Sequence, residues 1–384
     1  MSTVLELDGT THVVRYGMQD DKKEMCHVYF FRNGKRFIID VSGDDVRETP
    51  FYDTWRPLIE PFDPKTPAGR NWVEQWRNLA TLVITASLQQ LRELAPEVTY
   101  WITLGDYLHT PSYSLQVVKQ DGAQNGVATK ISKGPEDIPA YEFRPYGVDM
   151  FEGLLDGIPK VNCHQLTVLD CEKNWKVPPR KVHIADGQIA RFKGYEKPSK
   201  SVESGAMHCY SLDSIKCSLR LHETMQRLSP EPIPGLASVL GIVMDERVED
   251  NGSSESSPKQ LLAGILISWT GNDTMWDVVR DVDKADTEDI LRRSAAWRTK
   301  INNVLNRLHA FGLSFCDSNG TSWINDSSTY IDEKDAAWLT TGSSFVSEPR
   351  GGEAHNACVE ADMKAVRELF EEWLPAELAK KVGT

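Results

Sequence analysis

The sequence predicts an α+β fold in which small antiparallel sheets are combined with amphipathic helices. Two tight-turn dipeptides, Asn33-Gly34 and Asp186-Gly187, separate pairs of strand-like runs and favour hairpins. Apolar residues at three- and four-residue spacings predict long helices over residues 69–94 and 287–310. No internal repeat is visible, so we expect no solenoid or propeller.

The composition is that of a folded globular protein. The chain has 384 residues, of which 40% are hydrophobic and 26% charged, and its length suggests two packed units or one two-lobed enzyme. Residues 1–14 lack the basic flank and apolar run of a signal peptide, and no window resembles a membrane span. We therefore expect a cytoplasmic protein with no membrane partner.

Seven scattered cysteines include no C-x-x-C pair. We expect reduced thiols, without a disulfide framework or a thiolate zinc site, and we expect no bound metal. The net charge of −13 disfavours a nonspecific nucleic-acid binder and a DNA partner. One stretch, residues 173–200, is basic and is either a solvated surface or an anion-binding patch for a nucleotide or RNA. Its first four basic residues are Lys173, Lys176, Arg180 and Lys181.

The first predicted domain, residues 1–158, is an α+β extension. The apolar–polar alternation over residues 25–41, interrupted at 32–35, predicts a hairpin. The helix over 69–94 follows, and residues 98–104 have the composition of a strand. The glycines and mixed charges of residues 119–139 predict a loop.

Two further domains are predicted, a small sheet lobe over residues 159–270 and a mainly helical lobe over 271–384. Strands are expected at 164–170, 181–185, 188–195, 239–244 and 261–269. Helices are expected at 212–228, 287–310 and 360–374. The acidic, serine-rich residues 245–259 predict a mobile loop, with a domain linker as the alternative.

This order of elements resembles the protein-kinase fold. Residues 308–317, LHAFGLSFCD, resemble the entry to a kinase catalytic loop, and residues 330–339 resemble its continuation in fungal kinase-like proteins. Residues 264–267 are similar to the strand beside the hinge. By the same register Lys193 falls where the family has its phosphate-contacting lysine, and Glu223 lies in a helix like the one that carries the ion-pairing glutamate. The resemblance covers residues 160–374 and implies a two-lobed fold.

The departures from the family pattern imply that phosphoryl transfer has been lost. Kinases hold magnesium through the Asp of D-F-G, and this sequence has Thr341 there. The motif that should begin at Asp317 lacks its Lys and Asn, and no glycine-rich loop precedes Lys193. Asn325 or Asp326 is a candidate for a displaced metal ligand. ATP and magnesium are therefore not expected as cofactors.

Each candidate site residue also has a structural interpretation. Lys193 and Glu223 can form an ion pair that serves only the fold, and Asp317 is either a general base in a cleft or a turn-capping residue. Asp332, Asn325 and Asp326 are the substrate-binding candidates, and Asp332 is also a typical turn residue. His309 more often satisfies a backbone group than does chemistry, and three further residues lack company for a metal site: His208, Cys209 and His222.

Three functions remain open: an enzyme with a new reaction on a kinase-like scaffold, a noncatalytic pseudokinase that binds partners, and an atypical ATP-dependent kinase. We favour the first, through a resemblance to the fungal arginine-containing cyclodipeptide synthases of secondary metabolism. That resemblance implies peptide-bond formation from aminoacyl-tRNA. Amide formation from an activated ester needs a base, oxyanion donors and a carboxylate for the guanidinium. Asp317, Glu223 and Lys193 are the catalytic candidates, with Asp317 and Glu223 as the base and the guanidinium-pairing carboxylate in either order. The basic stretch would contact tRNA.

Overall fold

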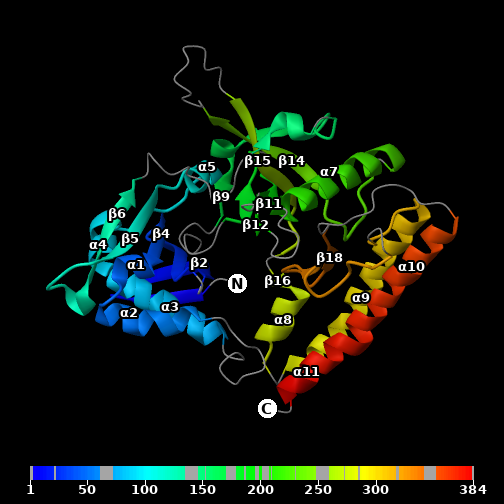
Figure 1. Ribbon diagram of the computed structural model, residues 1–384. Coiled ribbons are helices and arrows are strands. Elements are labelled where there is room, and N and C mark those ends of the chain that lie inside the picture. The colour runs from blue at the N-terminus through cyan, green and yellow to red at the C-terminus, as the bar shows by residue number, and fades with distance from the viewer. Residues whose placement is uncertain are drawn as a thin grey trace. The chain divides into compact units, whose positions relative to one another are not determined.

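The computed structural model has an α+β architecture with antiparallel sheets and helices (Figure 1). It describes residues 3–20, 23–60, 72–134, 146–151, 153–169, 179–185, 187–194, 199–200, 207–208, 210–229, 231–247, 259–271, 273–283, 286–316, 320–340 and 352–382. The chain divides into two compact units, which are described separately: residues 1–142 with 167–179, and residues 143–166 with 180–384.

The first unit is built on one sheet in the strand order β1-β2-β3-β4-β5-β6. The strands are β1 (Thr3–Leu7), β2 (Thr10–Asp20), β3 (Met25–Arg32), β4 (Lys35–Ser42), β5 (Ser112–Lys119) and β6 (Val127–Lys133). Neighbouring strands are antiparallel, except that β4 and β5 are parallel. The unit's other elements are α1 (Gly43–Val46), α2 (Pro50–Trp55), α3 (Trp72–Ala86), α4 (Leu88–Leu94), α5 (Leu104–Leu108) and β9 (Thr167–Val168), with 3-10 turns at Arg56–Ile59 and Gln124–Gly126.

The predicted hairpin is confirmed, with Asn33 and Gly34 as its turn. Both residues have positive φ, 51° and 75°, as a two-residue hairpin turn requires. A Cβ added to Gly34 would lie 1.9 Å from the backbone oxygen of Thr99, so the turn also needs glycine for space.

Three expectations for this unit are wrong in part. The helix expected over 69–94 is interrupted at Ser87, between α3 and α4. The Ser87 hydroxyl donates to the Val83 carbonyl at 3.1 Å and so competes with the backbone hydrogen bonds of the helix. Residues 98–104 form no strand, because Thr103 caps α5 in a reciprocal capping box with Asp106. The loop expected over 119–139 contains β6, which pairs with β5.

The sheet of the second unit follows the order β8-β14-β15-β11-β10. These strands are β8 (Lys160–Asn162), β14 (Val239–Arg247), β15 (Lys259–Ser268), β11 (Ile189–Gly194) and β10 (Lys181–His183), and β7 (Tyr146–Gly147) also pairs with β15. Helix α7 (Tyr210–Leu228) packs on the sheet through Ile215 and Leu219, which share a buried cluster with Ile242 and Ile265. The helix expected over 212–228 is thus confirmed.

The expected strand over 164–170 is largely wrong, because Cys163–Gln165 forms a 3-10 turn. A further 3-10 turn spans Val148–Phe151, and β12 (Ser199–Lys200) pairs with β13 (Met207–His208). The long strands β14 and β15 extend into the predicted loop from both sides; residues 248–258 lie outside the described part of the chain.

The remainder of the second unit is mainly helical. It contains α8 (Met275–Asp281), α9 (Thr287–Ala310), α10 (Gly352–Arg367), a π-helix (Glu368–Trp373) and α11 (Leu374–Val382), with the short strands β16 (Asp273–Thr274), β17 (Thr329–Ile331) and β18 (Ala337–Leu339). Helix α9 has the predicted bounds and runs beside α10 and α11 (Figure 1). Trp297 and Ile301 of α9 pack with Val366 and Leu374 in one buried cluster. Among the described residues, no helix has the length and apolar character to cross a membrane.

Candidate functional site

Lys193 of β11 faces two serines on helix α7. Its Nζ lies 2.5 Å from the Ser214 hydroxyl and 3.5 Å from the Ser218 hydroxyl, to both of which it donates. The two serines are four residues apart and so lie on the same helix face. Ser218 in turn donates to the backbone oxygen of Ser214 at 2.9 Å. We call these three residues the lysine–serine cluster.

The environment of Lys193 favours the neutral amine. Burial, followed by the positive charge of Arg191, lowers the pKa of Lys193 to about 8, although Cys217 opposes the shift. A lysine with its usual pKa is almost fully protonated at neutral pH. At a pKa near 8 a useful fraction is neutral, so Lys193 can accept a proton from a neighbouring hydroxyl.

A pocket of about 240 Å³ borders the cluster. One wall is helix α7, which contributes Ser218, His222 and Gln226 at successive turns. The opposite wall is the mostly apolar segment 231–240, which includes Ile233 and Leu236. Ser218 belongs both to the cluster and to the pocket lining, so the cluster borders the pocket at this residue.

Two features fix the polarity and shape of the pocket. Burial lowers the pKa of His222, which keeps its imidazole neutral at physiological pH, and the amide nitrogen of Gln226 lies 2.9 Å from its Nε2. The apolar wall is held to β18, because the Leu339 N–H donates to the Gly235 carbonyl at 2.8 Å and Ala237 N–H donates to the Leu339 carbonyl at 2.9 Å. Volume and lining suit a small amphipathic group.

Beside Lys193, on the same face of β11, the Arg191 side chain reaches β17. Its guanidinium lies over the ring of Tyr330 at 4.1 Å and donates to the Tyr330 hydroxyl at 3.1 Å. It also donates to Thr270 and to the Gly271 carbonyl, both at 3.4 Å. Burial lowers the pKa of Arg191, but its ordinary value is so high that the side chain stays cationic.

The structure does not bring Glu223 to Lys193. Glu223 is exposed, and it lies nine residues beyond Ser214, which corresponds to roughly 13 Å along the helix. The register of α7 against β11 presents hydroxyls where the kinase resemblance implied a carboxylate. The expected ion pair is therefore replaced by the lysine–serine cluster.

The other polar candidates serve turns. Asn325 accepts from the N–H groups of Ser327 and Ser328, both at 2.9 Å, and Asp326 accepts from the Ser327 hydroxyl at 3.2 Å. Asp332 accepts from the N–H groups of Lys334 and Ala336 and from the indole of Trp338, at 2.8 to 2.9 Å. The turn interpretation of Asp332 thus has a geometric basis. Asp317 and Thr341 lie outside the described residues.

Sequence reasoning missed Asp362 of α10, a fully buried carboxylate that organises the loop after α9. It accepts from the Phe315 N–H at 2.9 Å and from the Ser322 hydroxyl at 2.6 Å, and its Oδ2 lies 3.0 Å from His309 Nε2. His309 is therefore paired with a carboxylate and not with the backbone group that was expected. No local motif indicates the role of Asp362, because its hydrogen-bond partners lie 40 to 53 residues away in the sequence.

Only part of the basic patch is described. Arg180 is exposed, whereas Lys181 is committed to neighbours: its Nζ lies 3.3 Å from a Glu333 carboxylate oxygen and 4.5 Å from the ring centre of Trp269. Lys173 and Lys176 lie outside the described residues.

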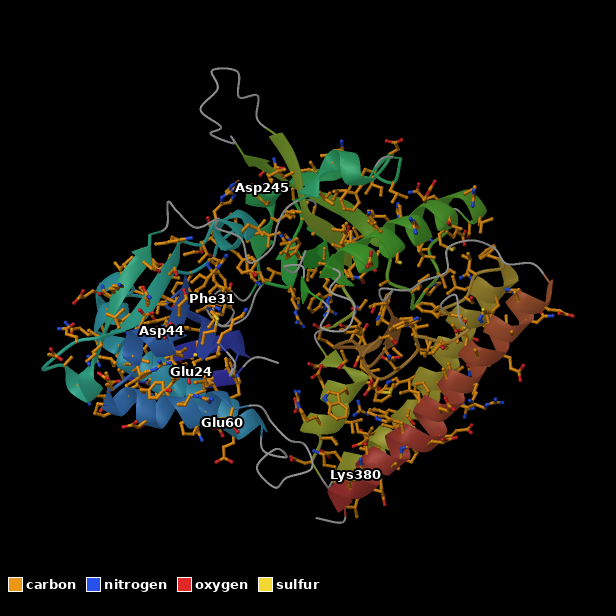
Figure 2. The ribbon with its side chains drawn as sticks, in the orientation of Figure 1. Glu24, Phe31, Asp44, Glu60, Asp245 and Lys380 are labelled. Carbon is orange, nitrogen blue, oxygen red and sulfur yellow. The ribbon has the colours of Figure 1, made fainter. Side chains whose placement is uncertain are left out.

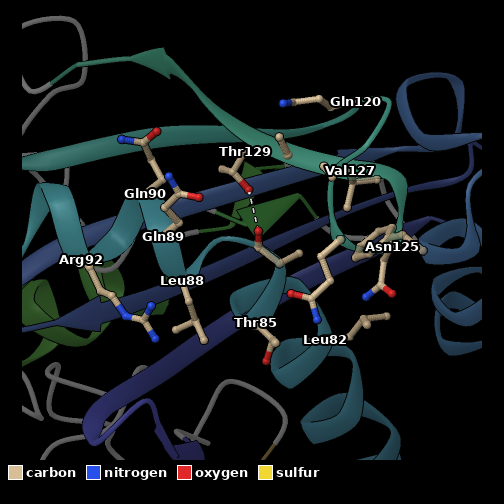
Figure 3. Close-up of a pocket in the computed structure, with 15 residues that line it drawn as sticks. Leu82, Thr85, Leu88, Gln89, Gln90, Arg92, Gln120, Asn125, Val127 and Thr129 are labelled. Atoms are coloured by element: carbon tan, nitrogen blue, oxygen red, sulfur yellow. Dashed lines mark hydrogen bonds between the residues drawn. The ribbon is translucent and has the colours of Figure 1, made fainter.

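The first unit has a larger groove, of about 660 Å³, beside the β5–β6 hairpin (Figure 3). Its lining is rich in amides, including Gln89, Gln90 and Gln120, and Thr129 donates to the Ala86 carbonyl at its edge. Its cation, Arg92, is paired with Asp8 at 3.0 Å. The groove offers hydrogen bonds rather than acid–base groups.

Comparisons with known proteins give little further assignment. No protein-family model and no curated protein matches this sequence. Among solved structures, the chain is similar to an apo pseudokinase at 10% identity and a TM-score of 0.27; the match covers 60% of this chain and 99% of that one. Values this low do not assign a fold. The molecule is an α+β protein whose second unit has a lysine–serine cluster beside a small pocket.

Proposed function

We propose that the second unit is a kinase-like scaffold that catalyses acyl transfer instead of phosphoryl transfer. The activated ester is an aminoacyl-tRNA, and the product is a cyclic dipeptide that contains arginine. The observation that carries this proposal is the lysine–serine cluster, because a lysine with a pKa of about 8 beside two hydroxyls is suited to activating a nucleophile.

The same residues argue against phosphoryl transfer. A kinase uses this lysine as a permanent cation, held by a glutamate and directed at the phosphates. Here the Lys193 amine donates to Ser214 and Ser218, where a kinase lysine pairs with a glutamate. The Arg191–Tyr330 stack also occupies the space next to Lys193 on the sheet face.

Ser218 is the proposed nucleophile because it borders the pocket. Neutral Lys193 takes the Ser218 proton, directly or through the Ser214 hydroxyl, as Oγ attacks the ester carbonyl. The ester C–O bond breaks, the departing tRNA oxygen receives the proton from the Lys193 ammonium, and an acyl-serine remains. The amine of the second aminoacyl group then attacks this ester and its proton passes to the serine oxygen, which forms the first amide and restores the serine. The free amine of the arginyl residue next attacks the ester of the second aminoacyl group. The second amide forms, the second tRNA oxygen leaves with the proton, and the ring closes.

The pocket provides groups for the acyl chain. Glu231 lies on its lining and is exposed, so its carboxylate can pair with a guanidinium at the mouth. We assign to Glu231 the guanidinium-pairing role for which Asp317 and Glu223 were the candidates, because Glu223 is not part of the pocket lining. Neutral His222 is placed to accept a proton from the attacking amine.

The test is incubation of the full chain with arginyl-tRNA and a second charged tRNA, followed by mass spectrometry of intact protein and products. We expect an arginyl adduct on Ser218 and a cyclic dipeptide, both lost in Ser218→Ala. Ser229→Ala is the matched control, because Ser229 lines the same pocket outside the cluster.

The alternatives predict different results. If correctly folded protein forms neither the adduct nor the product, a noncatalytic binding protein is the better description. Stabilisation by ATP only when magnesium is present, or two magnesium ions bound with ATP in a crystal, would instead favour a kinase.

A further inference from the structure

A second group of reactive side chains lies in the same unit, where β8 ends beside β14. It consists of Cys163 and His164, which are consecutive, and Asp245 (Figure 2 labels Asp245). One potential ligand atom from each residue lies within 4.8 Å of those of the other two. A thiol, an imidazole and a carboxylate thus converge.

The convergence follows from the pairing of β8 with β14. These strands are parallel, with Val161 opposite Val243 and Asn162 opposite Met244. One step further, Cys163 comes beside Asp245, and its thiol donates to Asp245 Oδ1 at 3.6 Å. Asn162 then caps the 3-10 turn by accepting from the His164 N–H at 2.9 Å, which turns His164 toward the same place.

Burial makes this group unlike an ordinary surface cluster. Cys163 and Asp245 are both fully buried, whereas His164 is exposed. A buried carboxylate is costly unless a cation or several donors compensate its charge. The thiolate, not the thiol, binds a metal ion. A metal bound at Cys163 would therefore displace the thiol proton.

We propose that Cys163, His164 and Asp245 bind a divalent cation of the zinc class. Sulfur, imidazole nitrogen and carboxylate oxygen are the ligand types that zinc prefers. Across a tetrahedral zinc ion, a sulfur and an oxygen ligand lie about 3.5 Å apart, close to the separation of the Cys163 and Asp245 atoms. His164 is exposed, which gives the ion a route of entry from solvent.

The proposal is tested with cobalt as a spectroscopic substitute for zinc in the chelator-treated full-length protein. We expect one Co²⁺ per chain, with a thiolate-to-cobalt charge-transfer band that equimolar Zn²⁺ abolishes. Cys163→Ser removes the band. His164→Ala weakens cobalt affinity at least about tenfold, because it removes one of three ligands.

Two controls make the test decisive. Cys358→Ser changes another buried thiol of the same unit, and His183→Ala changes a half-buried imidazole outside the group; neither is expected to alter the band. If Cys163→Ser does not fold, His164→Ala decides alone, because its side chain is exposed. Absence of the band in the unaltered protein, or full cobalt affinity in His164→Ala, would overturn the proposal.

Discussion

The guanidinium of Arg191 lies over the ring of Tyr330, 4.1 Å from its centre, and connects the sheet of the second unit to strand β17. A desolvated cation–aromatic contact with charge-assisted hydrogen bonds is among the stronger side-chain interactions in a protein.

Replacing Arg191 should therefore destabilise the second unit. We expect Arg191→Ala to lower the free energy of unfolding by about 2–3 kcal/mol, through the lost stack and the hydrogen bonds to Tyr330 and Thr270. Urea denaturation measures the loss. Arg180→Ala, an exposed arginine one strand away, should change stability by less than about 0.5 kcal/mol, and equal effects of the two would contradict the assignment.

The lowered pKa of Lys193 predicts a pH-dependent cost to stability. Between its folded pKa of about 8 and its ordinary value of 10.5, the unfolded chain binds the proton more tightly, so stability rises with pH across this window. Below pH 8 the cost is fully present. Lys193→Met should thus stabilise the protein at pH 7, by roughly 1–3 kcal/mol, and the gain should shrink by pH 10.

Denaturation of Lys193→Met at pH 7 and pH 10 measures this difference. The exposed Lys364 of α10 supplies the control, since Lys364→Met should show the same stability change at both pH values. A gain for Lys193→Met that does not depend on pH would mean that apolar packing, not the relief of a buried charge, is responsible.

The first unit should lose stability in mild acid because of His12. This histidine is fully buried, its Nε2 lies 2.8 Å from Arg32 Nη1, and burial followed by the Arg32 charge lowers its pKa to about 4. The unfolded chain takes up a proton near pH 6.5 and the folded chain does not. Stability therefore falls from pH 6.5 to pH 4, by up to about 3 kcal/mol.

Urea unfolding of the first unit between pH 4 and pH 6.5, monitored by tryptophan fluorescence, measures the effect. His12→Gln should reduce the dependence of its stability on pH. Asp8 accepts from Arg32 in the same group, and its pKa is lowered below 3.8, so it titrates at lower pH than this window. A slope that survives in His12→Gln would assign the acid sensitivity to another group.

Asp362 should be the most sensitive single carboxylate of the helical region. Asp362→Ala leaves several buried donors without their acceptor, including the Phe315 N–H and the Ser322 hydroxyl. We expect the free energy of unfolding to fall by about 3–5 kcal/mol. Glu360→Ala, exposed on the same helix, is the control. Thermal unfolding compares them, and similar melting temperatures would contradict the central role of Asp362.

The basic patch gives a prediction with a built-in contrast. If tRNA binds there, its affinity falls steeply with salt and weakens when Lys173, Lys176, Arg180 and Lys181 are all changed to alanine. Arg180→Ala should cost more affinity than Lys181→Ala, because the Lys181 charge is already shared with Glu333 and Trp269. A gel shift at two salt concentrations measures both effects. A larger loss of affinity in Lys181→Ala than in Arg180→Ala would mean that tRNA binds another surface.

Periodic segments were predictable from the sequence, and long-range contacts were not. Helix α9 has its predicted bounds because its apolar spacing is set by the helix itself. Residues 98–104 were predicted as a strand because their composition favours β-structure, but the Thr103 cap overrides that preference. The contact of Lys193 with Ser214 depends on how α7 packs on β11, and nothing local encodes that register.

The convergence of Cys163 with Asp245 was missed for a similar reason. The two residues are 82 positions apart, and only the pairing of β8 with β14 brings them together. The expectation of no metal rested on the absence of C-x-x-C pairs. A ligand set assembled by strand pairing escapes such a rule.

The position of Asp362 near the end of the chain also bears on synthesis. Ser322, whose hydroxyl donates to Asp362, leaves the ribosome about 40 residues earlier, so the loop after α9 lacks this carboxylate partner until α10 emerges. Nascent chains that stop before α10 would expose that loop to proteases and chaperones, and completion of this helix is the event that closes the helical region.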